Sequence, residues 1–325
     1  MQKFKFITHD NLDAYFNLAS EEYLLKHTDG YYFYLWINAP AVIVGVNQNA
    51  IEEVNLNYVE ENSIKVVRRM TGGGTVYHDL GNLCYTVIAP FNAEQDNYKA
   101  FTLPVIEYLN ELGVKAEFSG RNDIVIDGQK ISGNAQTVYK DRIMHHGTIL
   151  FDTDMSVLSR AIKPSKIKME SKGIKSVRAR VTNVKEHLQK PITIREFKEG
   201  LAKKFLSVCE PYTFTDSDKK AINELIENKY SRYEWNIGNS PKGVNQFSKK
   251  FGFGIFTLYF NTIDGKIADA EIKGDFFAKK DITPLADALN GAKFNKDELL
   301  ERLKRVDEYI VNASAIEIVD AIFER

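Results

Sequence analysis

A lysine with unusual neighbours is the first residue in this sequence to suggest chemistry. Lys130 follows the pair Asp127-Gly128, and Ser132 and Asn134 come after it at the two-residue spacing of a strand. Asp-Gly is a strong signal for a two-residue hairpin turn, which would place Asp123 opposite Ser132 in an unshifted ladder. A cation, a carboxylate, a hydroxyl and an amide would then share one strand face. That is more than a solvated strand face needs, so we expect a polar site here.

Three consecutive glycines, Gly72 to Gly74, form a second candidate site just after the pair Arg68-Arg69. Glycines let the backbone approach a ligand and expose its N–H groups, and arginines supply charge for an anion. A P-loop or a dinucleotide fingerprint would need a helix after the glycines, but residues 75–78 are β-branched and aromatic. The sequence therefore favours a different anion site, with a flexible loop and solvated arginines as the alternative.

Histidines and cysteines give weaker signals. His78 fits a hydrogen-bonded strand residue better than a catalyst, and the adjacent His145 and His146 point to opposite strand faces, so they cannot form a paired metal site alone. Cys84 lies in an apolar strand pattern and is expected to be inert core. Cys84 and Cys209 have no metal-ligand spacing, so neither a disulfide framework nor a zinc site is indicated.

A basic segment follows the strands. Residues 160–185 contain nine basic side chains and one acid, Glu170. In a chain with a formal net charge of −1 this asymmetry indicates an anionic partner, either a small phosphate or a macromolecule. Its core, residues 172–183, mixes Gly and Ser with cations and predicts a loop.

Length and composition limit the class of protein. The chain has 325 residues, 44% of them hydrophobic, which predicts about two globular domains. The near-neutral charge argues against a surface that binds nucleic acid throughout. No stretch approaches the ~20 apolar residues of a membrane span, and the N-terminus lacks the apolar core of a signal peptide. We expect a cytoplasmic protein.

The elements that must position these residues can be predicted from periodicity. Apolar residues at helical spacing predict helices near residues 12–26 (capped by Asp10 or Asn11), 56–61, 98–112, 194–208, 216–228, 282–289, 296–304 and 315–323. Strands are expected near residues 31–36, 41–45, 64–68, 75–78, 83–89, 124–126, 130–139, 143–151, 247–260 and 266–273, the last two joined by an Asp264-Gly265 turn. The breaker-rich residues 238–243 divide the chain into a domain at 1–243 and a small α+β domain at 244–325.

Taken in order, the segments Arg68 to Asp79, Gly120 to Gln136, His146-Gly147-Thr148 and Lys172 to Asn183 closely resemble the lipoate–protein ligase A family. The resemblance covers nearly the whole chain. It implies an α+β fold: a large mixed-sheet domain of the biotin/lipoate ligase type, like class II aminoacyl-tRNA synthetases, and a small α+β C-terminal accessory domain. It also implies the chemistry, in which lipoate or octanoate and Mg-ATP give the acyl-adenylate, and the acyl group then passes to an acceptor lysine.

The resemblance further implies roles for particular residues. Lys130 and Asp123 would be catalytic, and Asp123 would also contact Mg²⁺. The residues that would bind ATP or lipoate are Arg69, Gly73, Gly74, Thr75, Val76, Tyr77, His78, Asn122, Lys130, Ser132, Gly133, His146, Thr148, Lys172 and Arg178. The implied partners are lipoyl domains of 2-oxo-acid dehydrogenase acyltransferase subunits and the glycine cleavage H protein; no nucleic acid or membrane partner is expected.

Three alternatives remain at this point. An octanoyl- or lipoyltransferase of the same scaffold would use a cysteine thioester and no ATP, but no cysteine occurs between Cys84 and Cys209. A non-enzymatic protein could use the basic segment to bind nucleic acid or an acidic partner. A biotin–protein ligase is disfavoured because a Gly-Arg-Gly-Arg signature is absent.

Overall fold

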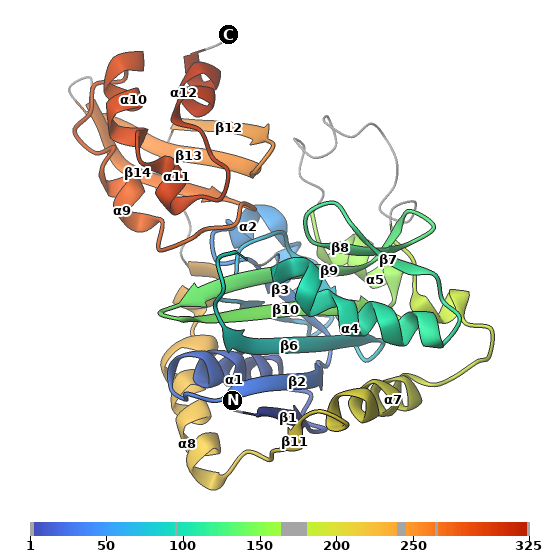
Figure 1. The fold of residues 1–325 in the computed structure, drawn as a ribbon. Coiled ribbons are helices and arrows are strands. Elements are labelled where there is room, and N and C mark those ends of the chain that lie inside the picture. The colour runs from blue at the N-terminus through green and yellow to red at the C-terminus, as the bar shows by residue number, and fades with distance from the viewer. Residues whose placement is uncertain (1–2, 95–96, 164–180, 239–244, 264–265, 324–325) are drawn as a thin grey trace.

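The computed structural model describes residues 3–94, 97–163, 181–238, 245–263 and 266–323 (Figure 1). Lys172, Arg178 and the Asp264-Gly265 turn therefore lie outside the described residues. In the part of the chain that is described, no helix is long and apolar enough to cross a membrane.

An eight-stranded mixed sheet forms the centre of the larger body, in the order β11-β1-β2-β6-β10-β9-β8-β7. The strands β11, β1 and β2 are parallel, and every later neighbour is antiparallel. Their bounds are β1 Phe4–Thr8, β2 Tyr31–Ile37, β6 Asn82–Pro90, β7 Ala116–Ser119, β8 Asp123–Ile126, β9 Gln129–Tyr139, β10 Arg142–Leu150 and β11 Glu210–Pro211.

Helices cover both faces of this sheet, and each face has its own apolar core. Side chains of α4 (Asn97–Glu111) and α7 (Ile194–Leu206) pack on one face, with Phe33, Tyr85 and Phe151 among the buried residues. Side chains of α1 (Ala14–Lys26) and α8 (Asp216–Leu225) pack on the other, around Trp36 and Cys84. The central strands are therefore buried on both sides, which is why they appear as continuous apolar runs.

Helix starts follow local capping chemistry. The N-cap of α1 is Asp13, whose side chain accepts from the Tyr15 N–H at 2.8 Å, so the expected cap at Asp10 or Asn11 was wrong. Thr193 and Thr215 begin α7 and α8 with capping boxes, in which the threonine and an acidic residue three positions later satisfy each other's backbone N–H groups. These two helices therefore begin at their polar cap residues.

A second, three-stranded sheet lies beside the first, in the order β4-β3-β5. Its strands are β3 Ala41–Val44, β4 Lys65–Arg68 and β5 Val76–His78, with the short helices α2 Ala50–Glu53, α3 Leu56–Glu61 and α5 Met155–Ala161 packed nearby. The triple glycine occupies the connection from β4 to β5. This small sheet therefore holds residues 72–74, called the glycine segment below, against the large sheet.

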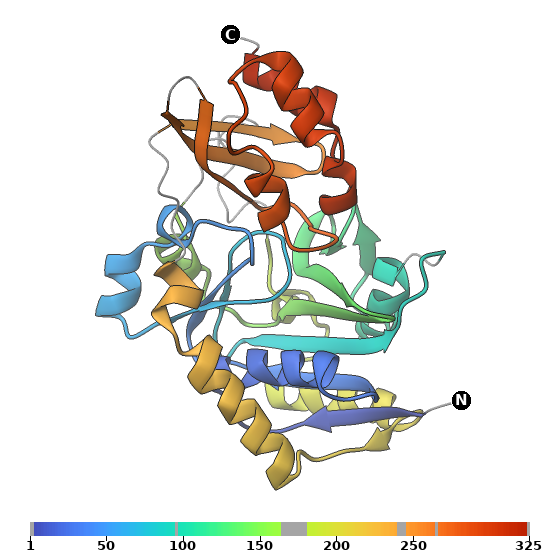
Figure 2. The same cartoon turned by 90° about the vertical axis from the view of Figure 1, so that its left-hand side faces the viewer.

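Residues 245–323 form a smaller α+β body with a core of its own (Figure 2). Its antiparallel sheet consists of β12 Asn245–Phe251, β13 Gly254–Ile263 and β14 Lys266–Gly274. Its helices are α9 Thr283–Asp287, α10 Lys296–Leu303, α11 Val306–Tyr309 and α12 Ala315–Phe323. The single strand expected at 247–260 was wrong: Gly252 and Gly254, the latter at φ +130°, allow a tight turn that divides it into two strands.

Candidate active site

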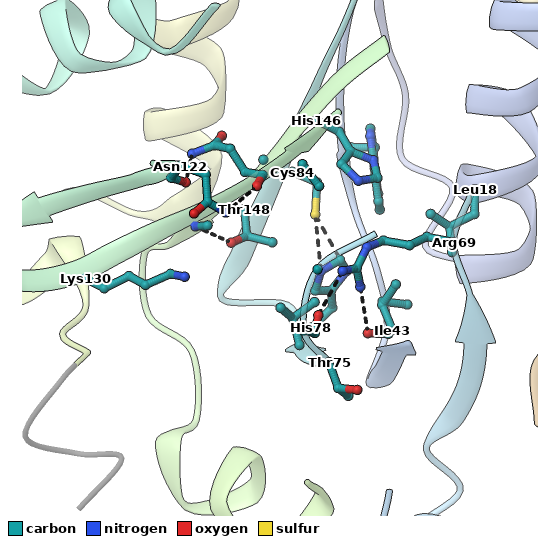
Figure 3. A pocket seen from close by; sticks show the side chains of 18 residues that line it. Leu18, Ile43, Arg69, Thr75, His78, Cys84, Asn122, Lys130, His146 and Thr148 are labelled. Carbon is teal, nitrogen blue, oxygen red and sulfur yellow. Dashed lines mark hydrogen bonds between the residues drawn. The ribbon is translucent and has the colours of Figure 1, made fainter. Parts of the chain in front are cut away.

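A cavity of about 150 Å³ lies between the two sheets of the larger body (Figure 3). One part of its wall is polar, with Lys130, Asn122 and Thr148, and another part is apolar, with Leu18, Trp36 and Ile43. Figure 3 shows Lys130 at one side of the cavity and Leu18, Ile43 and Arg69 at the other. The predicted residues that line it are Arg69, Gly73, Gly74, Thr75, Val76, His78, Asn122, Lys130, Gly133, His146 and Thr148.

Lys130 reaches the cavity from the start of β9. Its Nζ lies 2.7 Å from Asp123 Oδ1, and both side chains are about one-third exposed (38% and 34%). The hairpin turn forms as expected, with Asp127 and Gly128 both at positive φ, and Val125 pairs with Lys130. The predicted association of the lysine and the carboxylate is therefore present in the structure.

The predicted partner of Asp123 was wrong. A β-bulge between Ile124 and Val125 shifts the ladder, so Asp123 lies opposite Gly133 and Ile124 opposite Ser132. One extra residue in a strand moves all later side chains to the other face. Ser132 is thus buried on the α4 side of the sheet, where its Oγ accepts from Asn134 Nδ2 at 3.3 Å. It does not line the cavity.

Gly133 is the residue that the bulge brings to the Lys130 face. A Cβ atom at this position would lie 2.8 Å from Lys130 Nζ and 3.0 Å from its Cε. The Gly133 N–H donates to Thr148 Oγ1 at 3.4 Å, and Asn122 Nδ2 donates to the Asn134 carbonyl at 2.7 Å. The missing side chain leaves the lysine room to stand beside the backbone of β9.

Arg69 holds the glycine segment in place through hydrogen bonds to its carbonyl groups. Its guanidinium donates to the carbonyls of Gly72 (2.6 Å), Gly74 (2.8 Å) and Ile43 (3.1 Å), and its Nε donates to Thr71 Oγ1 at 3.0 Å. Gly73, between them, has φ +90°. Because the carbonyls are gathered onto the arginine, the segment's backbone can present N–H groups to the cavity. Burial lowers the pKa of Arg69 to about 10, which still leaves it charged at neutral pH.

A buried polar chain links Arg69 to helix α1. Thr71 Oγ1 lies 2.7 Å from His146 Nε2, and His146 Nδ1 lies 2.9 Å from Glu21 Oε1. Glu21 also accepts from Thr86 Oγ1 at 2.6 Å. Each group has a partner if Nδ1–H donates to the carboxylate and Nε2 accepts from the threonine hydroxyl. The glycine segment is therefore tied to the interior of the larger body.

His78 and Cys84 meet in the cavity wall, a contact that the sequence did not predict. Cys84 Sγ lies 3.6 Å from His78 Nδ1 and 3.8 Å from Nε2, and it accepts from Asn82 Nδ2 at 3.1 Å. Burial lowers the pKa of His78 to about 3 and raises that of the Cys84 thiol well above its usual value. At neutral pH the pair is an uncharged imidazole beside an uncharged thiol.

Tyr77 is separated from the other predicted residues. It alternates with Val76 and His78 along β5, so its ring packs on the opposite face of the small sheet, against Val42 and Val59. There it lines a different, open hollow of about 770 Å³ together with Leu80. Tyr77 does not line the cavity that contains Lys130.

Sequence reasoning missed most of the apolar wall. Leu18, Trp36, Ile43, Ala135 and Gly147 line the cavity, but strands that are apolar on both faces give no sign of which face meets a ligand. The structure explains why position 147 is a glycine, because a Cβ there would lie 2.1 Å from Asn134 Oδ1 and 2.7 Å from the Tyr85 ring.

Comparison with known proteins identifies the family of this chain. Residues 13–206 match the model of the lipoyl protein ligase A/B catalytic domain, and residues 240–322 match that of the bacterial lipoate protein ligase C-terminus. The chain belongs to the lipoate–protein ligase family. Lipoate-protein ligase LplJ of Bacillus subtilis (strain 168) is 42% identical to it over 329 residues, covering 98% of this chain and 99% of the relative.

Solved structures of ligases share the fold. The structure of P. falciparum LipL1 in complex with lipoate superposes with a TM-score of 0.78 at 29% identity, covering 98% of both chains. A lipoate-protein ligase A bound with ATP gives a TM-score of 0.64 at 28% identity, covering 73% of this chain and 99% of the other. The expected fold, a large mixed-sheet ligase domain with a small α+β C-terminal domain, is confirmed.

Proposed function

We propose that this ligase activates lipoate or octanoate with Mg-ATP to the acyl-adenylate and transfers the acyl group to the acceptor lysine of a lipoyl domain. The observation that supports this most directly is the Lys130–Asp123 pair, 2.7 Å apart, at one side of a cavity that also has an apolar wall of Leu18, Trp36 and Ile43. Lipoate is an apolar chain with one carboxylate, so it fits a pocket with apolar walls and a cationic end. The relatives that are lipoate–protein ligases support the same activity.

Charge explains how the site would promote the first step. A carboxylate that attacks the α-phosphate brings two anions together, and the leaving pyrophosphate carries further charge. Lys130 can offset this repulsion, and backbone N–H groups of the segment that Arg69 holds can bind phosphate oxygens. Both contacts stabilise charge that develops in the transition state, and they hold the reactants in line.

Asp123 suits the magnesium ion that such a reaction needs. Its buried Oδ1 atom lies 2.7 Å from Lys130 Nζ and has no further partner within the described residues, and Asn122 lies next to it in the chain. Mg²⁺ commonly uses one or two carboxylates together with substrate phosphates and water, so a single aspartate is a sufficient protein ligand. When bound, the ion would neutralise the phosphates during adenylate formation.

The remaining assignments are proposals of the same kind. We assign ATP and lipoate contacts to Arg69, Gly73, Gly74, Thr75, Val76, His78, Asn122, Gly133, His146 and Thr148, all of which line the cavity. For Arg69 the geometry favours an indirect role, because it already donates three hydrogen bonds to the loop of residues 71–74 and one to the Ile43 carbonyl in β3. Tyr77 and Ser132 face elsewhere and are better explained as structural. Lys172 and Arg178 keep their proposed role at the adenylate.

We propose lipoyl domains of 2-oxo-acid dehydrogenase acyltransferase subunits and the glycine cleavage H protein as acceptors, and a cytoplasmic location. We also propose the domain boundary at 243/244. The separate core of residues 247–323 and the family match beginning at residue 240 support a division in this part of the chain.

A pyrophosphate-release assay tests the proposal directly. Release should require Mg-ATP, occur with lipoate or octanoate but not with biotin, and be followed by a mass increase of an acceptor domain. No release with either acid would contradict the proposed function.

The position of Cys84 favours one alternative function, that of a thioester-forming acyltransferase. A thiol beside a histidine in the acyl cavity is what a thioester-forming transferase would need. Burial opposes this reading, because the raised pKa of Cys84 keeps the thiol protonated. Mass spectrometry after incubation with an octanoyl-carrier thioester should show no acyl adduct on Cys84; a stable adduct would favour the transferase.

A further inference from the structure

His78 places a polar group in the apolar part of the cavity. Its ring centroid lies 5.8 Å from that of Trp36, and its nitrogens lie within 3.8 Å of Cys84 Sγ. Figure 3 shows Lys130 at one side of the cavity and His78 well away from it, toward Ile43. A substrate whose carboxylate is held at Lys130 would therefore bring the far part of its chain to His78.

A chain of buried hydrogen bonds determines which nitrogen of His78 carries the proton. Asn17 Nδ2 is fixed by three acceptors, namely the carbonyls of Asn11 (3.2 Å) and Ile37 (3.1 Å) and Asn38 Oδ1 (2.8 Å). Asn38 thus presents its oxygen to Asn17, and its Nδ2 remains to donate to His78 Nδ1 at 3.1 Å. Since Nδ1 accepts this bond, the ring proton is on Nε2.

Two further contacts support this assignment. The chain continues outward from Asn17, whose Oδ1 accepts from Tyr34 OH at 2.9 Å, and Tyr34 OH lies 2.8 Å from His9 Nε2. Asn17 and Asn38 are fully buried, so water cannot substitute for these partners.

The ring of His78 also stays neutral, because burial and the charge of Arg69 lower its pKa to about 3. One N–H, on Nε2, is therefore available, with the Cys84 sulfur at 3.8 Å as its partner in the described residues.

We propose that His78 determines acyl specificity by donating its Nε2–H to a sulfur of the lipoate dithiolane ring, and that Asn38 is the positioning residue that keeps the proton on Nε2. This inference rests on the proposed function. Sulfur is a weak acceptor, but beside methylene groups the buried N–H keeps only the long contact to Cys84 Sγ at 3.8 Å, which costs more than having a second, closer sulfur partner. Octanoate has no acceptor at this depth, so the site should favour lipoate over octanoate.

Asn38→Asp tests the positioning role with little change of shape. A carboxylate at this position still accepts from Asn17 Nδ2, but it now requires a proton on His78 Nδ1, and at about pH 8.5 the neutral ring would then present a lone pair at Nε2. We expect the ratio of kcat/KM for lipoate to that for octanoate, measured by pyrophosphate release, to fall roughly tenfold. Asn295→Asp is the matched control, because Asn295 Oδ1 only accepts the N-cap bond from Glu298 N and an aspartate can do the same.

His78→Phe keeps the test decisive if the buried carboxylate prevents folding. This variant removes the donor and retains a flat ring, so the preference for lipoate should fall by a similar factor, mainly through a higher KM for lipoate. In the wild-type protein, the ¹⁵N shifts of His78 should show a protonated Nε2, and its N–H signal should move with lipoate more than with octanoate.

The outcomes separate this inference from the proposed function. An unchanged lipoate-to-octanoate ratio in both variants, or a proton on Nδ1 of the wild-type ring, would overturn the role of His78 while adenylation itself persists. Absence of pyrophosphate release with both acids in the wild type would instead contradict the proposed function.

Discussion

Three cations of this sequence show that residue type alone does not assign a role. Arg68 and Arg69 are adjacent, yet Arg68 is turned inward, where its Nη1 donates to the carbonyls of Gly45 (2.8 Å) and Gln48 (2.7 Å). Arg69 holds the glycine segment, and Lys130, paired with a carboxylate and one-third exposed, is the cation with access to a ligand. A cationic side chain whose donors are all hydrogen-bonded within the protein shapes a site. A cationic side chain with a single, partly exposed carboxylate partner can exchange that partner for substrate.

The first prediction concerns Lys130. Lys130→Ala should lower adenylate formation by roughly a hundredfold, because one contact that stabilises transition-state charge is lost. Lys140→Ala, which removes an exposed lysine that lies over the Tyr139 ring and does not line the cavity, is the control and should retain activity. Pyrophosphate release with lipoate measures both. Near-normal activity of a folded Lys130 variant would remove the lysine from the mechanism.

Arg69 gives a second prediction at the same scale. Arg69→Lys preserves the charge but cannot reach the carbonyls of Gly72, Gly74 and Ile43 together, because an ammonium lacks the planar fork. We expect the affinity for lipoate and ATP, measured by calorimetry, to fall about tenfold or more, the scale of one or two lost charge-assisted bonds. Unchanged affinity would show that the guanidinium does not shape the binding surface.

At the scale of elements, the site depends on two departures from regular structure. The bulge in β9 brings Gly133 to the side of Lys130 and removes Ser132 from it. The positive φ of Gly73 turns the connection between β4 and β5 so that Arg69 can hold its carbonyls. Regular strands would give neither arrangement, and bulges and left-handed residues are often found at functional sites for this reason.

These departures also mark the limit of what the sequence could predict. Periodicity gave most helices and strands, and Asp-Gly gave the turn at Asp127. The bulge leaves Ile124 and Ile131 in the same core, as an unshifted ladder would, so the apolar pattern did not reveal it and the partner of Asp123 was assigned wrongly. Cys84 was expected to be core, and it is; its contact with His78 depends on β5 and β6 belonging to different sheets.

The glycine segment can be tested through Gly73. A Cβ atom there would lie 3.1 Å from Arg69 Nη2 and 3.3 Å from the Phe277 ring. Gly73→Val should preserve the fold but reduce ligand affinity at least tenfold, because a β-branched residue resists positive φ and disturbs the held loop.

Gly291→Val provides the matched control for this substitution. Gly291 also has positive φ, at +80°, but a Cβ there meets nothing within 4 Å. Both variants should lose roughly 1–2 kcal/mol of stability from backbone strain, measured by urea unfolding, and only Gly73→Val should lose affinity. Equal affinity in the two variants would reduce the glycine segment to a simple turn.

At the scale of the whole molecule, the smaller body contacts the larger one through several polar and aromatic groups. Tyr259 OH donates to Glu52 Oε1 at 2.6 Å, and the Gly274 N–H donates to the Asn47 carbonyl at 2.7 Å. The Arg121 guanidinium lies 4.4 Å from the Phe277 ring centroid, directly before Asn122 and Asp123 in the chain. Stability of the whole and geometry of the site are therefore physically connected.

Burial of histidines makes that stability depend on pH. The pKa of His145 falls from 6.5 to about 3, caused first by burial and then by the charge of His146; burial also lowers the pKa of His9 to about 4. Since these values lie below those of the unfolded chain, the unfolded state binds more protons between about pH 3 and 6.5. The stabilisation is thus complete above pH 6.5 and is lost progressively as the pH falls through this window.

His145→Gln isolates one of these contributions. His145 accepts from Gln136 Nε2 (2.9 Å) and faces Asn134 Oδ1 (3.2 Å), and glutamine supplies an acceptor and a donor without a titrating ring. Between pH 7.5 and 5.0 one such histidine should cost about 2 kcal/mol of unfolding free energy, since 1.5 units separate pH 5.0 from the unfolded pKa. The drop measured by urea unfolding should therefore be about 2 kcal/mol smaller in the variant than in the wild type. An equal drop in both would mean that His145 does not remain neutral in the folded protein, and acid sensitivity would then have to come from other groups.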